Sequence, residues 1–280
     1  MYPAVASAIN WGLPFYLLGL FGIICFFIRS SPSKSNEITW NPWETLGVTV
    51  AIYFVSQILG AALIYIYPLT QGWSQNQANY WFEHNIYGQF LLVLAVEAIS
   101  LLLLALYLRR RKASFKTIGL KPPRWLRDAG YVILGFGVYF TVYLIVLGIL
   151  SGMVHIDVNQ QQQIGFDNAH GIQLLPVFIS LAILPPIAEE IIVRGFLYSG
   201  LKKTLPVFWA VLITSVMFAT AHLQAGSGQP LLWVAGIDTF ILSLVLIYLR
   251  EKTDSLYASI GLHMLKNTIA FLGLFVFKVM

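Results

Sequence analysis

The stretch PPIAEEIIVRGF, residues 185–196, places two adjacent carboxylates, Glu189 and Glu190, inside an otherwise apolar run. Glu190 and Arg194 are four residues apart, so on a helix they share one face and can form an ion pair. Glu189 points about 100° away around the helix and has no local partner. We therefore predict that Glu189 is available for proton transfer and that Glu190 and Arg194 support it.

Two further stretches supply the groups that such a carboxylate needs for hydrolysis. VMFATAH, residues 216–222, ends in His222, and GLHMLKN, residues 261–267, places His263 and Asn267 on one helical face. A carboxylate beside an imidazole can hold and deprotonate a water molecule. A second histidine and an asparagine can donate hydrogen bonds to a developing oxyanion. These types and spacings predict a hydrolase site.

The same atoms allow a metal site. Glu189, His222 and His263 match the set of one glutamate and two histidines that holds catalytic zinc. The chain lacks HExxH, so no compact zinc motif decides between the two chemistries. We expect no cofactor, with zinc on these three residues as the alternative.

The composition predicts that lipid, rather than water, surrounds most of the chain. Of the 280 residues, 58% are hydrophobic and 10% are charged, whereas soluble domains carry about 25% charged residues. Backbone groups in lipid must be satisfied internally, which favours helices of about 20 apolar residues. The sequence therefore predicts an all-α, polytopic integral membrane protein with about eight transmembrane helices. The predicted spans are 11–28, 45–68, 86–108, 129–151, 172–201, 206–223, 231–249 and 255–277.

Lysine and arginine gather in alternate connectors, above all in a basic loop at 109–128. By the positive-inside rule these connectors are cytoplasmic and both termini lie outside. The positive net charge is thus a topology signal, and a nucleic-acid partner is not expected. We divide the chain into 1–171, with four N-terminal helices and the basic loop, and 172–280, with the four helices that carry the motifs.

Helix lengths indicate that the first two motifs meet. The spans that carry Glu189 and His222 are joined by the turn LKKTLP at 201–206. In an antiparallel hairpin each residue lies roughly 25 Å from that turn, at 1.5 Å per residue. Three other ionisable residues lie inside spans: Glu97 and Asp238, for which we expect structural roles, and Lys266, expected to pair with a carboxylate or face the cavity.

The motifs E-E-x-x-x-R at 189–194, F-x-x-x-H at 218–222 and H-x-x-x-N at 263–267, in this order, resemble those of the CPBP intramembrane protease family. That family includes type II CAAX prenyl endopeptidases and bacterial proteins tied to bacteriocin self-immunity. The resemblance covers about 172–275. It implies that Glu189 activates water with help from His222, and that His263 and Asn267 form an oxyanion hole. It further implies that Glu190 and Arg194 support the site.

The function expected is therefore that of an integral-membrane endopeptidase, by a glutamic mechanism or, alternatively, as a metalloendopeptidase. Its partners would be the lipid bilayer and a peptide or protein substrate, with membrane-embedded and lipidated substrates both open. The expected location is a bacterial-type cell membrane. The rival functions are a non-catalytic membrane scaffold for immunity or secretion, and a proton-coupled transporter.

Overall fold

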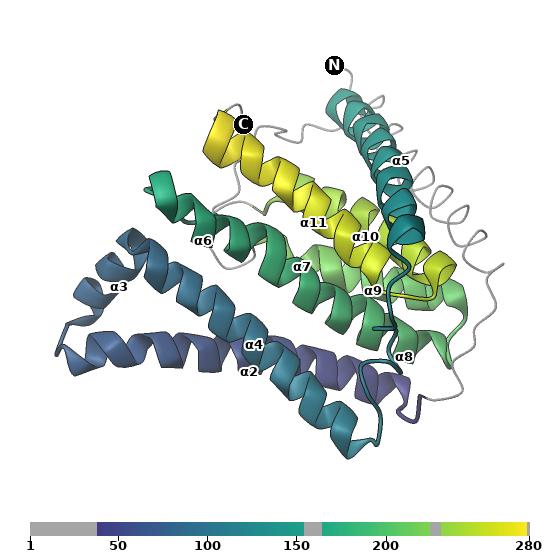
Figure 1. Cartoon of the computed structure of the whole chain (residues 1–280), viewed down its shortest axis with the longest axis horizontal. Coiled ribbons are helices and arrows are strands. Elements are labelled where there is room, and N and C mark those ends of the chain that lie inside the picture. Colours follow the sequence, from purple (N-terminus) through teal and green to yellow (C-terminus); the bar gives the residue numbers. More distant parts are fainter. Residues whose placement is uncertain (1–37, 154–163, 225–230, 279–280) are drawn as a thin grey trace, which may run out of the picture.

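The computed structural model describes residues 38–153, 164–224 and 231–278, and all regular structure in these ranges is helical (Figure 1). Six helical stretches in these ranges are long and apolar enough to cross a membrane. They are Pro42–Thr70, Ile86–Arg110, Trp125–Leu150, Gly171–Lys202, Trp233–Thr253 and Tyr257–Phe277. The prediction of an all-α, polytopic membrane protein is thus confirmed.

The predicted number of eight spans is not confirmed. The first predicted span, 11–28, lies outside the described residues. The span predicted at 206–223 forms a helix of only 15 residues, Val207–Ala221. Its length is about 22 Å, short of the roughly 30 Å of a hydrocarbon core. The helix ends where Nδ1 of His222 forms a hydrogen bond to the carbonyl oxygen of Phe218, four residues earlier.

The first half of the described chain contains α2 (Pro42–Thr70), α3 (Gln75–His84), α4 (Ile86–Arg110) and α5 (Trp125–Met153). Asn41 begins α2 by accepting a hydrogen bond from the backbone N–H of Glu44, and the Glu44 side chain accepts one from the N–H of Asn41. The helices α2 and α4 form a hairpin closed by α3 (Figure 1). They approach closely at Gly60, where a Cβ atom would lie 2.5 Å from Cγ2 of Val96.

The central element is a helical rod, Gly171–Lys202, that changes its winding several times. It consists of η1 (Gly171–Gln173), α6 (Leu174–Phe178), the π-helical η2 (Ile179–Ile183), α7 (Leu184–Glu189), the π-helical η3 (Glu190–Tyr198) and α8 (Ser199–Lys202). Its parts contact α2 and α4 on one side. On the other they contact α9 (Val207–Ala221), α10 (Trp233–Thr253) and α11 (Tyr257–Phe271), which continues into η4 (Leu272–Phe277).

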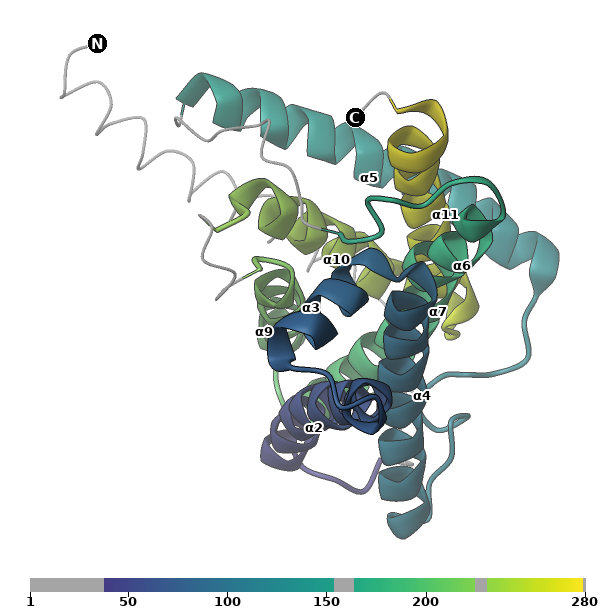
Figure 2. The ribbon, with the colours of Figure 1, turned by 90° about the vertical axis from the view of Figure 1, so that its left-hand side faces the viewer.

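The helices α5, α10 and α11 pack together beside the rod (Figure 2). Of the six candidate spans, α10 buries the largest share of its residues, because α5, α9, α11 and η3 all contact it. The rod therefore lies between the α2–α4 hairpin and this second group of helices. Residues that project from its two sides face different neighbours.

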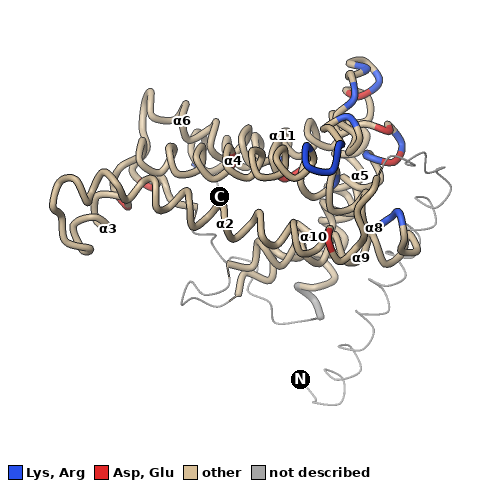
Figure 3. The backbone as a smooth tube through the Cα atoms, turned by 90° about the horizontal axis from the view of Figure 1, so that it is seen from below, with Lys and Arg blue, Asp and Glu red and all other residues tan. Residues whose placement is uncertain are grey.

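Lysine and arginine residues gather at one end of the helices (Figure 3). There the connector between α4 and α5 folds back onto the protein, and the carbonyl of Gly119 accepts a hydrogen bond from the N–H of Leu256. Lys121 and Arg250 both pair with Asp254. Partial burial alone would raise the pKa of Asp254, but the hydrogen bond and charge of Lys121, with Arg250, hold it below its ordinary value of 3.8.

Candidate active site

A fully buried ion pair lies where α7 passes into η3. Nη1 of Arg194 is 2.8 Å from Oε1 of Glu190, and neither side chain is exposed. Both residues lie on the same helix four positions apart, as the sequence pattern indicates. Burying either charge alone would be costly, so loss of one partner should destabilise the fold more than loss of both.

His263, on the neighbouring helix α11, also contacts this pair. Its Nδ1 is 2.9 Å from Oε1 of Glu190, the same oxygen that accepts the hydrogen bond from Arg194. An ionised carboxylate only accepts hydrogen bonds, so Nδ1 carries the proton. Nε2 of the same ring lies 3.8 Å from Oε2 of Glu189. Glu190 therefore holds the ring of His263 in an orientation that presents Nε2 towards Glu189.

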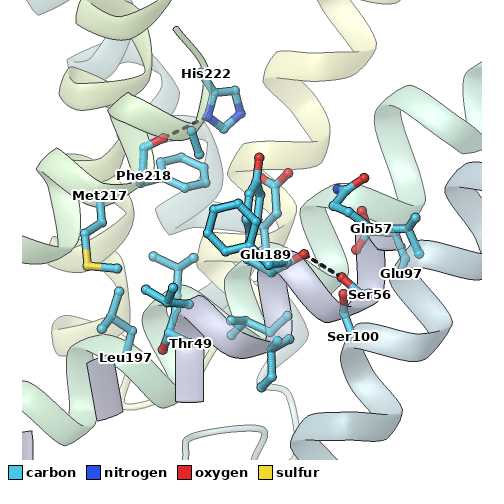
Figure 4. A pocket seen from close by; sticks show the side chains of 18 residues that line it. Thr49, Ser56, Gln57, Glu97, Ser100, Glu189, Leu197, Met217, Phe218 and His222 are labelled. Atoms are coloured by element: carbon cyan, nitrogen blue, oxygen red, sulfur yellow. Dashed lines mark hydrogen bonds between the residues drawn. The ribbon is translucent and has the colours of Figure 1, made fainter. Parts of the chain in front are cut away.

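Glu189 and His222 line one cavity of about 200 Å³ (Figure 4). The side chain of Glu189 is 28% exposed, and no described residue donates a hydrogen bond to its Oε2. Nδ1 of His222 lies 2.8 Å from the carbonyl oxygen of Phe218. Because a carbonyl only accepts, Nδ1 carries the proton, and Nε2 is the ring nitrogen that has a lone pair for a proton or a ligand.

Phe218 lies at the centre of the charged and aromatic contacts. Its ring is 4.8 Å from that of His222 and 5.8 Å from that of His263, both at steep angles. The guanidinium carbon of Arg194 lies 4.0 Å from its centroid, a cation–π contact. Phe218 thus lines the cavity and contacts His222 there, and it also contacts Arg194 and His263 of the buried network.

Asn267 has a different immediate partner from the one its predicted role suggests. Its Nδ2 donates a hydrogen bond of 2.9 Å to the carbonyl oxygen of Leu181. The N–H groups that would reach this carbonyl in an α-helix or a π-helix belong to Pro185 and Pro186, which have none. Asn267 therefore satisfies a carbonyl that the Pro-Pro pair leaves open. The amide keeps its second N–H for another acceptor.

The six predicted residues thus form three connected groups. Glu189 and His222 share the cavity, Glu190, Arg194 and His263 form the buried network behind it, and Asn267 braces the rod. His263 and Asn267 are not among the described residues that line this cavity.

The helices α2 and α4 contribute polar side chains to the cavity that the motifs do not indicate. Ser56 and Gln57 come from α2, and Glu97 and Ser100 come from α4. Sequence reasoning identified Glu97 only as a lone carboxylate within a span. The spacing of these polar residues, i, i+1 on α2 and i, i+3 on α4, could have indicated a polar surface. It does not show that the two helices face the same cavity until their packing is known.

A second cluster missed by sequence reasoning lies between α5, α10 and α11. Nζ of Lys266 is 2.8 Å from Oδ2 of Asp238, and Tyr139 donates a hydrogen bond to Oδ1 of the same carboxylate. Lys266 is expected from the sequence to pair with a carboxylate or to face the cavity, and its partner is Asp238. It holds α11 to its neighbours directly beside Asn267.

The donor atoms do not form a three-ligand metal site in this arrangement. Among the described residues no group of three histidine, cysteine, aspartate or glutamate side chains could hold a metal ion. Nδ1 of His263 faces Glu190, and only its Nε2 lies near Glu189. A zinc ion on Glu189, His222 and His263 would require these side chains to move together.

The arrangement suits acid–base chemistry. Glu189 and His222 line the same cavity, and the buried Oε2 of Glu189 receives no hydrogen bond from any described residue, although Nε2 of His263 lies 3.8 Å away. A low-dielectric setting strengthens every electrostatic interaction with a substrate that enters. Water held between the two residues would be close to a carboxylate able to take its proton.

Comparison with known proteins points to a family of proteases. Residues 171–269 match the model of a family described as type II CAAX prenyl endopeptidase Rce1-like. No curated protein and no solved structure matches the chain. The matched segment begins with the central rod and ends in α11, so it contains all six motif residues. Over residues 171–269 this multi-pass membrane protein is therefore similar to the Rce1-like proteases, which confirms the resemblance to the CPBP family indicated by its three motifs.

Proposed function

We propose that this protein is an integral-membrane endopeptidase that hydrolyses a peptide bond at or within the bilayer. One observation carries the proposal: Glu189, with an oxygen that no described residue hydrogen-bonds, shares a cavity with the basic nitrogen of His222. The similarity of residues 171–269 to a protease family supports it independently.

In the proposed reaction Glu189 removes a proton from a water molecule that His222 helps to hold. The water oxygen forms a bond to the carbonyl carbon of the substrate, and the electron pair of the C=O bond moves to its oxygen. When the C–N bond breaks, the proton held by Glu189 passes to the leaving nitrogen. This returns the carboxylate to its starting state.

We assign stabilisation of the oxyanion to His263 and Asn267. Nε2 of His263 lies 3.8 Å from Oε2 of Glu189, so a carbonyl bound beside Glu189 comes within reach of this ring. Nδ1 of His263 donates to the Glu190 carboxylate, so the ring can donate from Nε2 to the oxyanion only as the imidazolium. Asn267 would donate its second N–H, while the first stays on Leu181. Glu190 and Arg194 support the site by fixing the ring.

The substrate of this proposal is a peptide or protein segment that reaches the cavity from the bilayer, with or without a lipid group. Glu189 lies roughly 20 Å along the rod from Lys202, which belongs to the basic end. We propose that this end is cytoplasmic and that the protein resides in a bacterial-type cell membrane.

A comparison of protein termini in host cells tests the proposal. Cells would carry wild type, Glu189→Gln or, as a matched control, Glu83→Gln, which removes an exposed carboxylate of α3 away from the cavity. We expect new termini near membrane segments in cells with wild type and Glu83→Gln, and none with Glu189→Gln. If Glu189→Gln accumulates normally and gives the same termini as wild type, the protein is a scaffold and the proposal is wrong.

We propose that catalysis needs no metal, and metal analysis tests this choice. The purified wild type is expected to contain no stoichiometric zinc, and chelation should leave peptide cleavage unchanged. Zinc at one equivalent in wild type that is lost in His222→Ala would instead assign Glu189, His222 and His263 as ligands. The protein would then be a metalloendopeptidase.

A further inference from the structure

The cavity beside Glu189 has two unlike sides. Figure 4 shows Ser56, Gln57, Glu97 and Ser100 on one side of Glu189, and Met217 and Leu197 on the other. The polar side comes from α2 and α4, which lie outside the matched segment 171–269. A peptide laid across Glu189 would therefore meet a polar wall in one direction and, in the other, a wall on which Met217 and Leu197 lie beside Thr49.

Glu97 is the only ionisable side chain on the polar wall. It is partly buried, and none of the residues that the structure describes forms a hydrogen bond or an ion pair with it. Its carboxyl group thus lines the cavity and can form hydrogen bonds or an ion pair with a bound molecule. An ionisable group in a membrane span normally has a partner or faces a functional cavity.

No positive side chain of the cavity wall balances the two carboxyl groups. Among the described residues that line it there is neither lysine nor arginine. The nearby Arg194 does not line the cavity; it is ion-paired with Glu190 and lies over the ring of Phe218. A bound cation would relieve the repulsion between Glu97 and Glu189, whereas a bound carboxylate would add to it.

We propose that Glu97 forms a subsite for a lysine or arginine side chain of the peptide substrate, next to the bond that Glu189 hydrolyses. The amide of Gln57 and the hydroxyl of Ser100 lie on the same wall and can bind the peptide backbone or the remaining donors of the basic group. The substrate residue on the other side of the scissile bond is apolar, facing Met217 and Leu197. This inference rests on the proposed peptidase function.

The first measurement of the test extends the comparison of termini. Sites that disappear with Glu189→Gln define the substrates, and we expect basic residues to be enriched on one side of these sites, close to the cleaved bond. The enrichment should be lost with Glu97→Gln and kept with Glu83→Gln. Glu97→Lys should exchange it for an enrichment of acidic residues.

The second measurement uses paired peptides that span one such site and differ only in lysine or glutamine at the enriched position. For wild type we expect a kcat/KM ratio of roughly tenfold or more in favour of lysine, as a charge-assisted hydrogen bond predicts. With Glu97→Gln the ratio should fall towards one. This readout also works with wild type alone, should the variant not accumulate.

The outcomes separate the inference from the function on which it rests. Glu189-dependent sites without a basic preference, or a lysine preference that survives Glu97→Gln, would overturn the subsite. Equal loss of cleavage of both peptides in Glu97→Gln would also overturn it, because Glu97 would then act on something other than a basic side chain. If no terminus depends on Glu189, the proposed function fails and the subsite fails with it.

Discussion

The side-chain amide of Asn267 in α11 donates a hydrogen bond of 2.9 Å to the carbonyl oxygen of Leu181 in η2, 86 residues earlier in the chain. Pro185 and Pro186 leave this carbonyl without a donor from its own helix. The Pro-Pro pair that precedes Glu189 and the H-x-x-x-N motif are thus parts of one structural device. It fixes α11 against the rod about 12 Å along the helix from Glu189.

We expect Asn267→Leu to lower the free energy of unfolding by about 1–3 kcal/mol, because the Leu181 carbonyl loses its donor in a partly buried place. Pro185→Ala supplies a backbone N–H four residues after Leu181. The double variant should therefore be less destabilised than the sum of the single variants. SDS-titration unfolding in detergent measures this, and strict additivity would show that the two sites do not share this carbonyl.

The buried pair behind the cavity should dominate the stability of the rod. Glu190→Gln leaves Arg194 charged and fully buried, which we expect to cost about 3–5 kcal/mol. Adding Arg194→Met removes the stranded charge and should restore part of the loss. The matched control, Lys121→Met at the exposed pair with Asp254, should change unfolding by under about 1 kcal/mol. Equal effects for the buried and exposed pairs would refute this assignment.

The Asp238–Lys266 pair should act as one unit. In a double-mutant cycle with Asp238→Asn and Lys266→Met we expect a coupling of about 0.5–3 kcal/mol, since the side chains are 15% and 24% exposed and lie 2.8 Å apart. The same variants should lower the rate of peptide cleavage, because α11 carries His263 and Asn267. A coupling near zero would mean that Tyr139 alone satisfies Asp238.

The basic end of the protein should carry a pH-dependent contribution to stability. The pKa of Asp254 is held below 3.8 by Lys121 and Arg250 in the folded state. A depressed carboxyl pKa stabilises the fold above the unfolded pKa of about 3.9, and that contribution is lost as the pH falls through the folded value. The difference in melting temperature between wild type and Asp254→Asn should therefore be constant above about pH 5 and shrink below pH 4. A difference that grows towards acid pH would contradict this sign.

How far the sequence predicts this protein depends on whether partners share a helix. Glu190 and Arg194 are visible in the sequence because their spacing alone brings them together. The contact of His263 with Glu190 spans 73 residues, and nothing in the local spacing of either residue specifies it. The same holds for Lys266 with Asp238 and for Glu97, whose surroundings depend on how α2 and α4 pack against the rod.

The predicted span at 206–223 shows a second limit. Apolar composition indicates where a helix can lie in the bilayer, but it does not mark where a side chain ends it. The ring of His222 bonds to the carbonyl of Phe218 and the helix stops at Ala221. The residue that the motif assigns to chemistry is thus also the residue that shortens the helix.

The two walls of the cavity belong to different parts of the chain: the motif residues follow Gly171, and the polar wall precedes Met153. Under the proposed function, mutations in α2 and α4 would therefore change which peptides are accepted, while the residues proposed for hydrolysis lie in another part of the chain. Related proteins could then differ in substrate preference through differences in their first helices. A chimera that joins residues 171–280 to another N-terminal half would keep the proposed reaction but not the preference.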